Sequence, residues 1–152
     1  MSTDKKESKA IDDPDVQAFG DFLESFRSVE RVLAADLQKH AGMSHVWFDA
    51  LIRIASAPER TMTMGALSHE TSLSSGGVTR LVDRLEEAGY VTRAQSKADR
   101  RVNTATLTSR GGEALESAAI VHRESIRKHL TGKLTEAGLR RFLDTLATIR
   151  VV

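Results

Sequence analysis

The segment that decides the fold is MGALSHETSLSSGGVTRLVDRLEEAGYV, residues 64–91. Residues 64–71 predict a short helix, and Ser74 is suited to cap a second, longer helix after a turn. The apolar side chains of the second helix recur at helical spacing and form one stripe: Val78, Leu81, Val82 and Leu85. Gly89 suits the left-handed backbone conformation just past the helix end. Two helices joined by a short turn in this way are typical of a helix-turn-helix.

The start of the longer helix is suited to contact with a nucleic acid. Its first residues have little bulk, so backbone N–H groups and the positive end of the helix dipole can meet phosphate oxygens. Thr79 and Arg80 lie off the apolar stripe, where they can reach base edges. Glycine inside a helix costs about 1 kcal/mol against alanine, and close approach to a phosphate backbone or a frayed first turn would each explain Gly76 and Gly77. The DNA-binding candidates on this helix are Ser74, Ser75, Gly76, Thr79, Arg80 and Arg84.

A basic hairpin is predicted directly after this helix. Residues 90–94 and 102–107 are rich in Val, Thr and Tyr, which favours two strands. The segment between the strands is too long and too charged for a two-residue turn, so it predicts a projecting tip, or wing. An arginine at such a tip can enter a minor groove, whereas a solvated hairpin tip is the alternative. Asp99 either orients the tip by pairing with an arginine or is an exposed turn residue. The wing candidates are Lys97, Asp99, Arg100 and Arg101.

The two ends of the chain predict amphipathic helices with more apolar surface than one small core needs. One helix is expected from Pro14 to near Gly42, another from residue 109 to about Leu130, and a last one after Thr135. A homodimer sealed by the chain ends would bury these faces, and an intramolecular helical layer is the alternative. The candidates for the dimer seam are Phe19, Phe22, Phe26, Leu139, Phe142 and Leu146.

The predicted fold is mainly α with a small β-hairpin wing, a winged helix-turn-helix. We expect a disordered tail at residues 1–14 and a helical dimerisation region at 15–42 and 109–152. The DNA-binding region is expected at 43–108, within one compact chain.

Composition excludes several classes of protein. The chain has no cysteine, which excludes disulfides, thiolate zinc sites and thiol redox switches. No apolar run approaches the roughly 18 residues of a membrane span, so we expect no membrane partner and a cytoplasmic location. The sequence has no Gly-rich phosphate loop after a strand, no HExxH motif and no nucleophile elbow, so we expect neither an enzyme nor a bound cofactor. The net charge of +1 hides an acidic segment at 1–36 and a basic one at 91–110, the kind of local field that attracts phosphate.

Residues 62–110 closely resemble the winged helix-turn-helix of MarR-type transcriptional regulators. The resemblance rests on LSSGGVTRLVDRLEEAGYV, on ADRRV at the wing tip and on TLTSRGG before the next helix. The flanking helices match in order, so it covers about residues 15–150. It implies an obligate homodimer whose two winged heads bind a palindromic operator, most often as a repressor. It also implies that Arg101 enters the minor groove and that the major groove is contacted by Ser75, Gly76, Thr79 and Arg80.

The resemblance further implies a small anionic aromatic effector bound between the dimer helices and the winged head. The candidate ligand pocket comprises His45, Trp47, Asp49 and Arg53, and the alternatives are a core tryptophan and a solvated arginine. No two of the five histidines are four residues apart, so no metal site is assigned, although some relatives bind zinc through histidines and carboxylates. We therefore predict a sequence-specific regulator that binds double-stranded DNA. The alternative is an architectural or protein-binding winged-helix module that reads no sequence.

Overall fold

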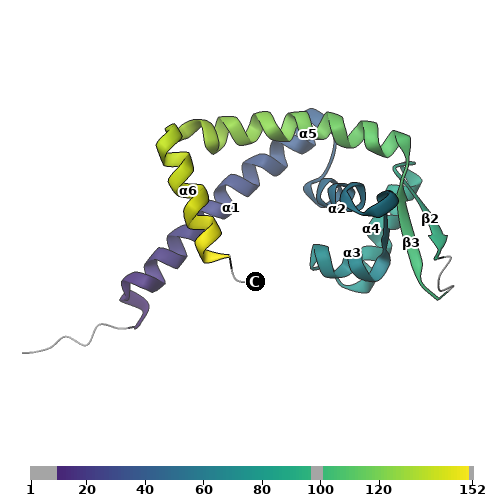
Figure 1. The fold of residues 1–152 in the computed structure, drawn as a ribbon, viewed down its shortest axis with the longest axis horizontal. Coiled ribbons are helices and arrows are strands. Elements are labelled where there is room, and N and C mark those ends of the chain that lie inside the picture. Colours follow the sequence, from purple (N-terminus) through teal and green to yellow (C-terminus); the bar gives the residue numbers. More distant parts are fainter. Residues whose placement is uncertain (1–9, 97–100, 151–152) are drawn as a thin grey trace, which may run out of the picture.

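A long helical stalk carries a smaller head at one end in the computed structural model, which describes residues 10–96 and 101–150 (Figure 1). Helices α1 and α5 form the stalk, and helices α2 to α4 with a small sheet form the head. The predicted order of helices and strands is confirmed, and so is the mainly α chain with a β-hairpin wing. Three of the predicted wing residues, Lys97, Asp99 and Arg100, lie outside the described residues.

Helix α1, Pro14–Ala41, has the bounds that its sequence predicts. The side chain of Asp13 caps it by accepting a backbone N–H at 2.8 Å, and proline at the first helical position needs no N–H partner. Gly42 ends the helix in the left-handed conformation, with φ of 64°. The expectation of disorder through residue 14 is wrong for the last part of that segment, because a 3-10 turn at Ala10–Asp12 leads directly into the capped helix.

The head packs α2 (His45–Ser56), α3 (Met64–Thr71) and α4 (Ser75–Glu87) around one core. Each helix begins after a residue whose hydroxyl accepts a backbone N–H, namely Ser44, Thr63 and Ser74. The whole predicted stripe of α4 is buried, and it packs in the same core as Leu51, Ile54 and Leu67. Each fully buried Leu, Ile or Val side chain stabilises the fold by about 1.5–3 kcal/mol, so this core fixes how α3 and α4 meet.

A three-stranded antiparallel sheet adjoins the helices of the head, with strand order β1-β3-β2. Its strands are β1 (Thr61–Thr63), β2 (Val91–Gln95) and β3 (Asn103–Leu107), reached from α2 through a 3-10 turn at Pro58–Arg60. The predicted hairpin is confirmed, and each of its strands begins one residue later than expected. Because β3 lies between the other two, β2 is an edge strand with one side free of strand pairing.

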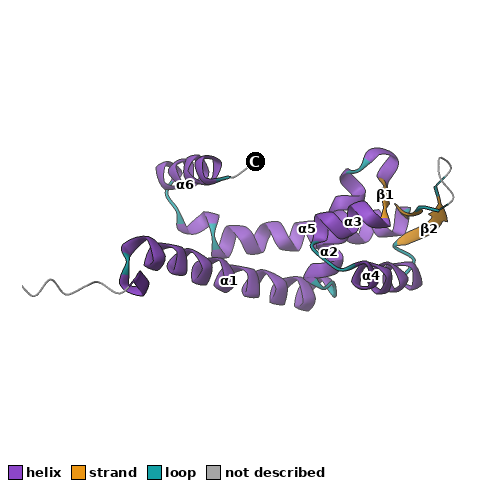
Figure 2. Cartoon of the chain, turned by 90° about the horizontal axis from the view of Figure 1, so that it is seen from below, coloured by secondary structure: helices purple, strands orange, loops and turns teal. Residues whose placement is uncertain are grey.

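Helix α5, Ser109–His129, leaves the sheet and runs beside α1 along the stalk (Figure 2). A Cβ atom at Gly111 would come within 2.1 Å of the Tyr90 carbonyl oxygen, so only glycine lets the helix start this close to the strand. Farther along, the Ser125 hydroxyl donates to an Asp36 carboxylate oxygen of α1 at 2.5 Å. This hydrogen bond holds the pKa of Asp36 below its ordinary value.

Helix α6, Glu136–Ile149, follows a 3-10 turn at Thr131–Lys133 and begins after the predicted cap, Thr135. It crosses α1 in Figure 1 but lies apart from it in Figure 2, and none of its residues is buried. Leu143 and Ile149 of α6 are exposed, whereas Leu139, Phe142 and Leu146 are half-buried. No helix in the described part of the chain is long and apolar enough to cross a membrane.

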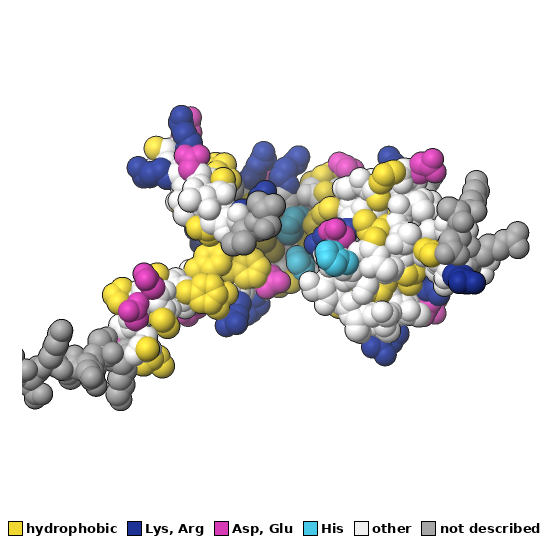
Figure 3. Space-filling view, turned by 60° about the horizontal axis from the view of Figure 1, so that its bottom comes forward, with side chains coloured by type: hydrophobic (Ala, Val, Ile, Leu, Met, Phe, Trp, Pro, Cys, Tyr) yellow, Lys and Arg dark blue, Asp and Glu magenta, His cyan; other side chains and the backbone are white. Residues whose placement is uncertain are grey.

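Apolar side chains of α1 are also exposed to solvent. Phe19, Phe22 and Phe26 are 63%, 45% and 56% exposed, against 50% and 40% for Val46 and Ile52 of the head. Figure 3 shows hydrophobic side chains gathered on the stalk beside the head. A continuous apolar surface of this kind is typical of a protein–protein contact.

Candidate nucleic-acid interface

The first turn of α4 is ordered and faces outward. The Ser74 hydroxyl accepts the N–H of Gly77 at 3.2 Å, and Ser75 and Gly76 are exposed. The two glycines differ in their surroundings. A Cβ at Gly77 would come within 3.3 Å of the Ser74 hydroxyl, whereas one at Gly76 would meet nothing within 4 Å. Packing within the chain therefore accounts for Gly77 and leaves Gly76 unexplained, as expected where another molecule approaches the backbone.

The polar side chains of α4 lie on the exposed side of the helix. The Thr79 hydroxyl donates to the Ser75 carbonyl oxygen at 3.0 Å, which fixes its rotamer. Arg80 and Arg84 are exposed, and neither forms an ion pair with any other described residue. Both line a shallow cleft of about 310 Å³ whose other walls include Trp47. The exposed side of α4 therefore presents two cations that have no ion-pair partner among the described residues.

The wing continues the hairpin beyond the strands. The Ser96 N–H donates to the Val102 carbonyl oxygen at 2.7 Å, so pairing extends to the last described residue before the tip. Arg101, on the other side of the tip, is exposed. Arg110, at the start of α5, lies over the ring of Tyr90 with 6.0 Å from its guanidinium carbon to the ring centroid.

Arg93 of β2 has a role that the sequence did not reveal. It lies in the basic segment 91–110, and its guanidinium forms an ion pair with Asp83 of α4. Its backbone N–H donates to a carboxylate oxygen of Glu86 at 3.0 Å. Both carboxylates lie on the outer side of α4, where Glu86 is exposed and the Asp83 side chain is 47% exposed. In the sequence, this contact is indicated only by the three-residue spacing of Asp83 and Glu86 along one face of α4 and by the cation Arg93, which follows the helix.

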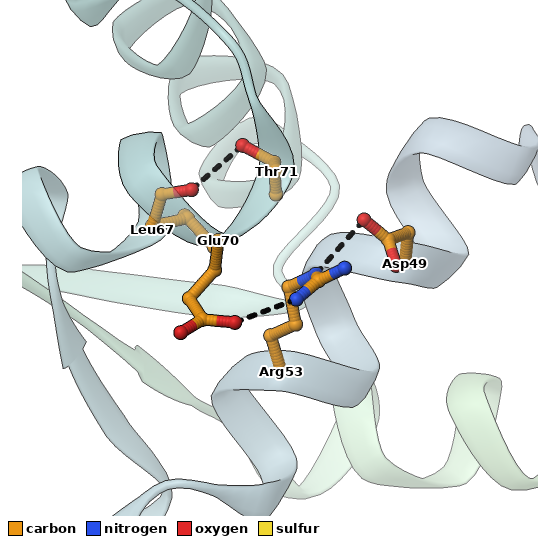
Figure 4. Close-up of polar contacts among 5 residues, drawn as sticks. All are labelled: Asp49, Arg53, Leu67, Glu70 and Thr71. Carbon is orange, nitrogen blue, oxygen red and sulfur yellow. Dashed lines mark hydrogen bonds and ion pairs between the residues drawn. The ribbon is translucent and has the colours of Figure 1, made fainter. Parts of the chain in front are cut away.

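The candidate ligand pocket does not come together as one site. The Arg53 guanidinium donates to Asp49 at 2.9 Å and to Glu70 of α3 at 2.8 Å, and both contacts are drawn in Figure 4. The hydrogen bond that Arg53 donates to Asp49 raises the pKa of Arg53 above its ordinary value. With two carboxylates on one guanidinium, the charge of Arg53 is already compensated within the chain. Arg53 therefore ties α2 to α3, with its side chain 31% exposed.

The other two pocket candidates face different neighbours. The Trp47 ring is edge-on to Tyr90, with ring centroids 6.0 Å apart, so it belongs with the cleft beside α4. His45 lies near His122 of α5, with ring centroids 6.3 Å apart. Burial, and secondly the neighbouring His45, lower the pKa of His122. Within residues 10–96 and 101–150, no three His, Asp or Glu side chains are grouped so as to hold a metal ion.

Comparisons with known proteins show to which family this architecture belongs. The sequence profile of the MarR family matches residues 41–102. The regulator YkoM of Bacillus subtilis, described as an uncharacterised HTH-type transcriptional regulator, is 30% identical over 112 residues, which are 73% of this chain and 70% of that protein. This chain belongs to the MarR family. Two MarR family regulators of Streptomyces coelicolor have similar structures, both at 27% identity.

One of these MarR family structures was determined in complex with DNA. It superposes with a TM-score of 0.79 and covers 90% of this chain and 87% of its own. The other, AbsC, has a TM-score of 0.80 and covers 93% and 95%. Since both matches extend over nearly the whole chain, the stalk helices as well as the head share the MarR architecture.

Proposed function

We propose that this MarR family chain is a transcriptional regulator that binds specific sequences of double-stranded DNA as a homodimer. The observation that carries the proposal is the exposed side of α4, where Gly76 is unobstructed in the first turn and where Arg80 and, farther along, Arg84 have no ion-pair partner among the described residues. A surface of this kind leaves its positive charge to be compensated by another molecule. The relative from Streptomyces coelicolor that was crystallised with DNA supports DNA as that molecule.

The two grooves are assigned to different parts of the head. We assign Ser75, Gly76, Thr79 and Arg80 to the major groove, and Ser74 and Arg84 to the phosphate backbone beside it. The minor groove takes Arg101, and the remaining wing candidates, Lys97, Asp99 and Arg100, are assigned to the wing contact from the sequence alone. The exposure of Thr79, Arg80 and Arg101 supports this division.

The dimer joins the stalks of two chains. Its seam takes Phe19, Phe22 and Phe26 from α1 with Leu139, Phe142 and Leu146 from α6, within the regions 15–42 and 109–152. The open phenylalanines and the absence of any buried residue in α6 support this proposal. Two identical heads related by a two-fold axis would favour a near-palindromic operator.

The test is a selection of bound duplexes from a random pool, followed by affinity measurements at fixed salt. We expect half-sites spaced by about one helical turn, roughly 34–36 Å, and a specific site preferred over random duplex by at least about 10³. Equal affinity for all duplexes would instead indicate an architectural winged-helix module. A chain that remains monomeric in sedimentation and retains no duplex at low salt would overturn the whole proposal.

Repression, with release by a small anionic aromatic effector, is the mode we propose for regulation. Because Arg53 is already held by Asp49 and Glu70, we place the anion away from it and favour the side of α2 that carries Trp47. Thermal-shift screening of aromatic acids, read together with release of the selected duplex, tests this. An acid that stabilises the protein but leaves the duplex bound would separate ligand binding from regulation.

A further inference from the structure

Arg93 is the residue through which the wing contacts the recognition helix α4 most closely. Its guanidinium forms the ion pair with Asp83 and lies 3.5 Å from the Thr79 carbonyl oxygen, while its backbone N–H donates to Glu86. The three acceptors are four and three residues apart, so they lie along one face of α4. A single residue of β2 therefore contacts successive turns of the helix that carries the major-groove candidates.

The contact also covers an open sheet edge. Strand β2 pairs only with β3, so the backbone groups on its outer side have no strand partner. Glu86 accepts the Arg93 N–H on that side, which means that α4 occupies the place where a further strand would pair. The hairpin is thus fastened to α4 by side chains as well as by the turn at Gly89.

The charge of Arg93 is used inside the head. Its side chain is 27% exposed, and its Nε atom is buried without a hydrogen-bond partner among the described residues. An arginine held in this way by Asp83 has little charge left for phosphate. Arg80 and Arg84, by contrast, are exposed and form no ion pair with the other described residues.

We propose that Arg93 is a positioning residue, which holds the wing at a fixed angle to α4 so that both DNA grooves are contacted by one rigid unit. This inference rests on the proposed DNA binding. It states that Arg93 itself does not contact DNA, although it lies within the basic segment. Loss of Arg93 therefore weakens binding because the wing loses its orientation, and not because a phosphate contact is removed.

The salt dependence of binding separates these two effects. For Arg93→Gln we expect about tenfold weaker binding to the selected duplex with an unchanged slope of log K against log salt concentration. Arg101→Ala, a matched loss of one cation, should lower that slope by about one. A slope that falls by about one for Arg93→Gln, or an affinity that does not change, overturns the inference.

A second measurement uses Arg101 to report on the orientation of the wing. The loss of affinity caused by Arg101→Ala should shrink to less than about a third of its parental value in the Arg93→Gln background, since the wing is no longer held. The loss caused by Arg80→Ala should be the same in both backgrounds. Equal losses for Arg101→Ala in the two backgrounds contradict the inference. Asp83→Asn should reproduce Arg93→Gln, and the double variant should be no worse than either.

A measurement without DNA distinguishes a failure of this inference from a failure of the proposed function. Hydrogen exchange of the β2 and β3 amides should be faster in Arg93→Gln and Asp83→Asn, while the amides of α5 stay protected. Unchanged exchange in the hairpin overturns the inference whether or not DNA binds. Should Arg93→Gln fail to fold, Asp83→Asn removes the same ion pair from the side of α4 and gives the comparison. Absence of DNA binding by the parent chain, with faster exchange in the variants, would contradict only the proposed function.

Discussion

The variants Arg80→Ala and Arg101→Ala are expected to bind DNA more weakly in two different ways. Arg80 projects from the part of α4 assigned to base edges, so Arg80→Ala should relax preference at the contacted base pair by about 1–3 kcal/mol. Arg101 is assigned to the wing, so Arg101→Ala should weaken binding to every duplex by a similar factor. Affinities for the selected site and for single-base variants of it measure both effects. Equal losses on every sequence for both variants would contradict the assignment.

His122 predicts a stability that depends on pH. Burial and the nearby His45 lower its pKa in the folded chain from the ordinary 6.5. Because the unfolded chain binds the proton more readily, the stabilisation is complete above pH 6.5 and falls as the pH drops through 6.5 toward the lowered pKa. Urea midpoints at fixed protein concentration, measured between about pH 5 and pH 8, should therefore rise with pH.

That prediction is checked by replacing His122 of α5 and, as the control, a second histidine that lies in the head. His122→Phe should remove much of the pH dependence, since the ring can still pack on Phe48, whose centroid lies 4.8 Å from that of His122. His69→Gln changes an exposed histidine on α3 and should leave the dependence in place. An unchanged dependence in His122→Phe would show that other groups cause it.

At the scale of one element, Gly76 in the first turn of α4 is expected to lower the stability of the helix and to raise its affinity for DNA. Nothing lies within 4 Å of a Cβ at Gly76, so Gly76→Ala should stabilise the helix by up to about 1 kcal/mol. The same methyl group would stand between the helix and a phosphate backbone, so DNA affinity should fall. Thermal unfolding and duplex binding of one variant test both effects. A more stable variant with full affinity would mean that the backbone is not approached there.

The matched glycine in α5 should behave in the opposite way. A Cβ at Gly111 would come within 2.1 Å of the Tyr90 carbonyl oxygen, so Gly111→Ala should destabilise the fold by several kcal/mol or prevent folding, as overpacking does. Comparing the thermal unfolding of the two variants shows whether a glycine serves the fold or the surface. A Gly111→Ala variant as stable as the parent would contradict the packing described here.

The elements themselves could be predicted because their signals are local. Ser74 and Thr135 cap the helices that are expected to follow them, and the α4 stripe is buried at the predicted positions. The roles of Arg53 and Arg93 could not be predicted in this way. Their partners Glu70 and Asp83 lie 17 and 10 residues away in the sequence, on other elements. Such pairs depend on how the helices pack, and helical periodicity shows only that these charges are outside the stripe.

At the scale of the whole molecule, the open faces of α1 and α6 predict that charge at the seam separates the chains. Phe22→Glu combined with Phe26→Glu should give a folded monomer that binds the palindromic duplex far more weakly, because two heads no longer bind together. Ile52→Glu, which changes an exposed apolar residue of the head, serves as the control and should stay dimeric. Sedimentation measures the mass, and a dimeric double variant would contradict the seam.

Helix α5 begins under the wing and ends in the stalk, so it acts as a lever between the two. Its 21 residues span about 32 Å at 1.5 Å per residue. A tilt of about 5° at the stalk end would move the other end of the helix by about 3 Å, close to the 3.4 Å rise of DNA per base pair along its axis. In the homodimer that we propose, the distance between the two heads would therefore have to match the proposed operator to within about one base pair. A molecule that tilts α5 by a few degrees would then move one head out of step with its half-site.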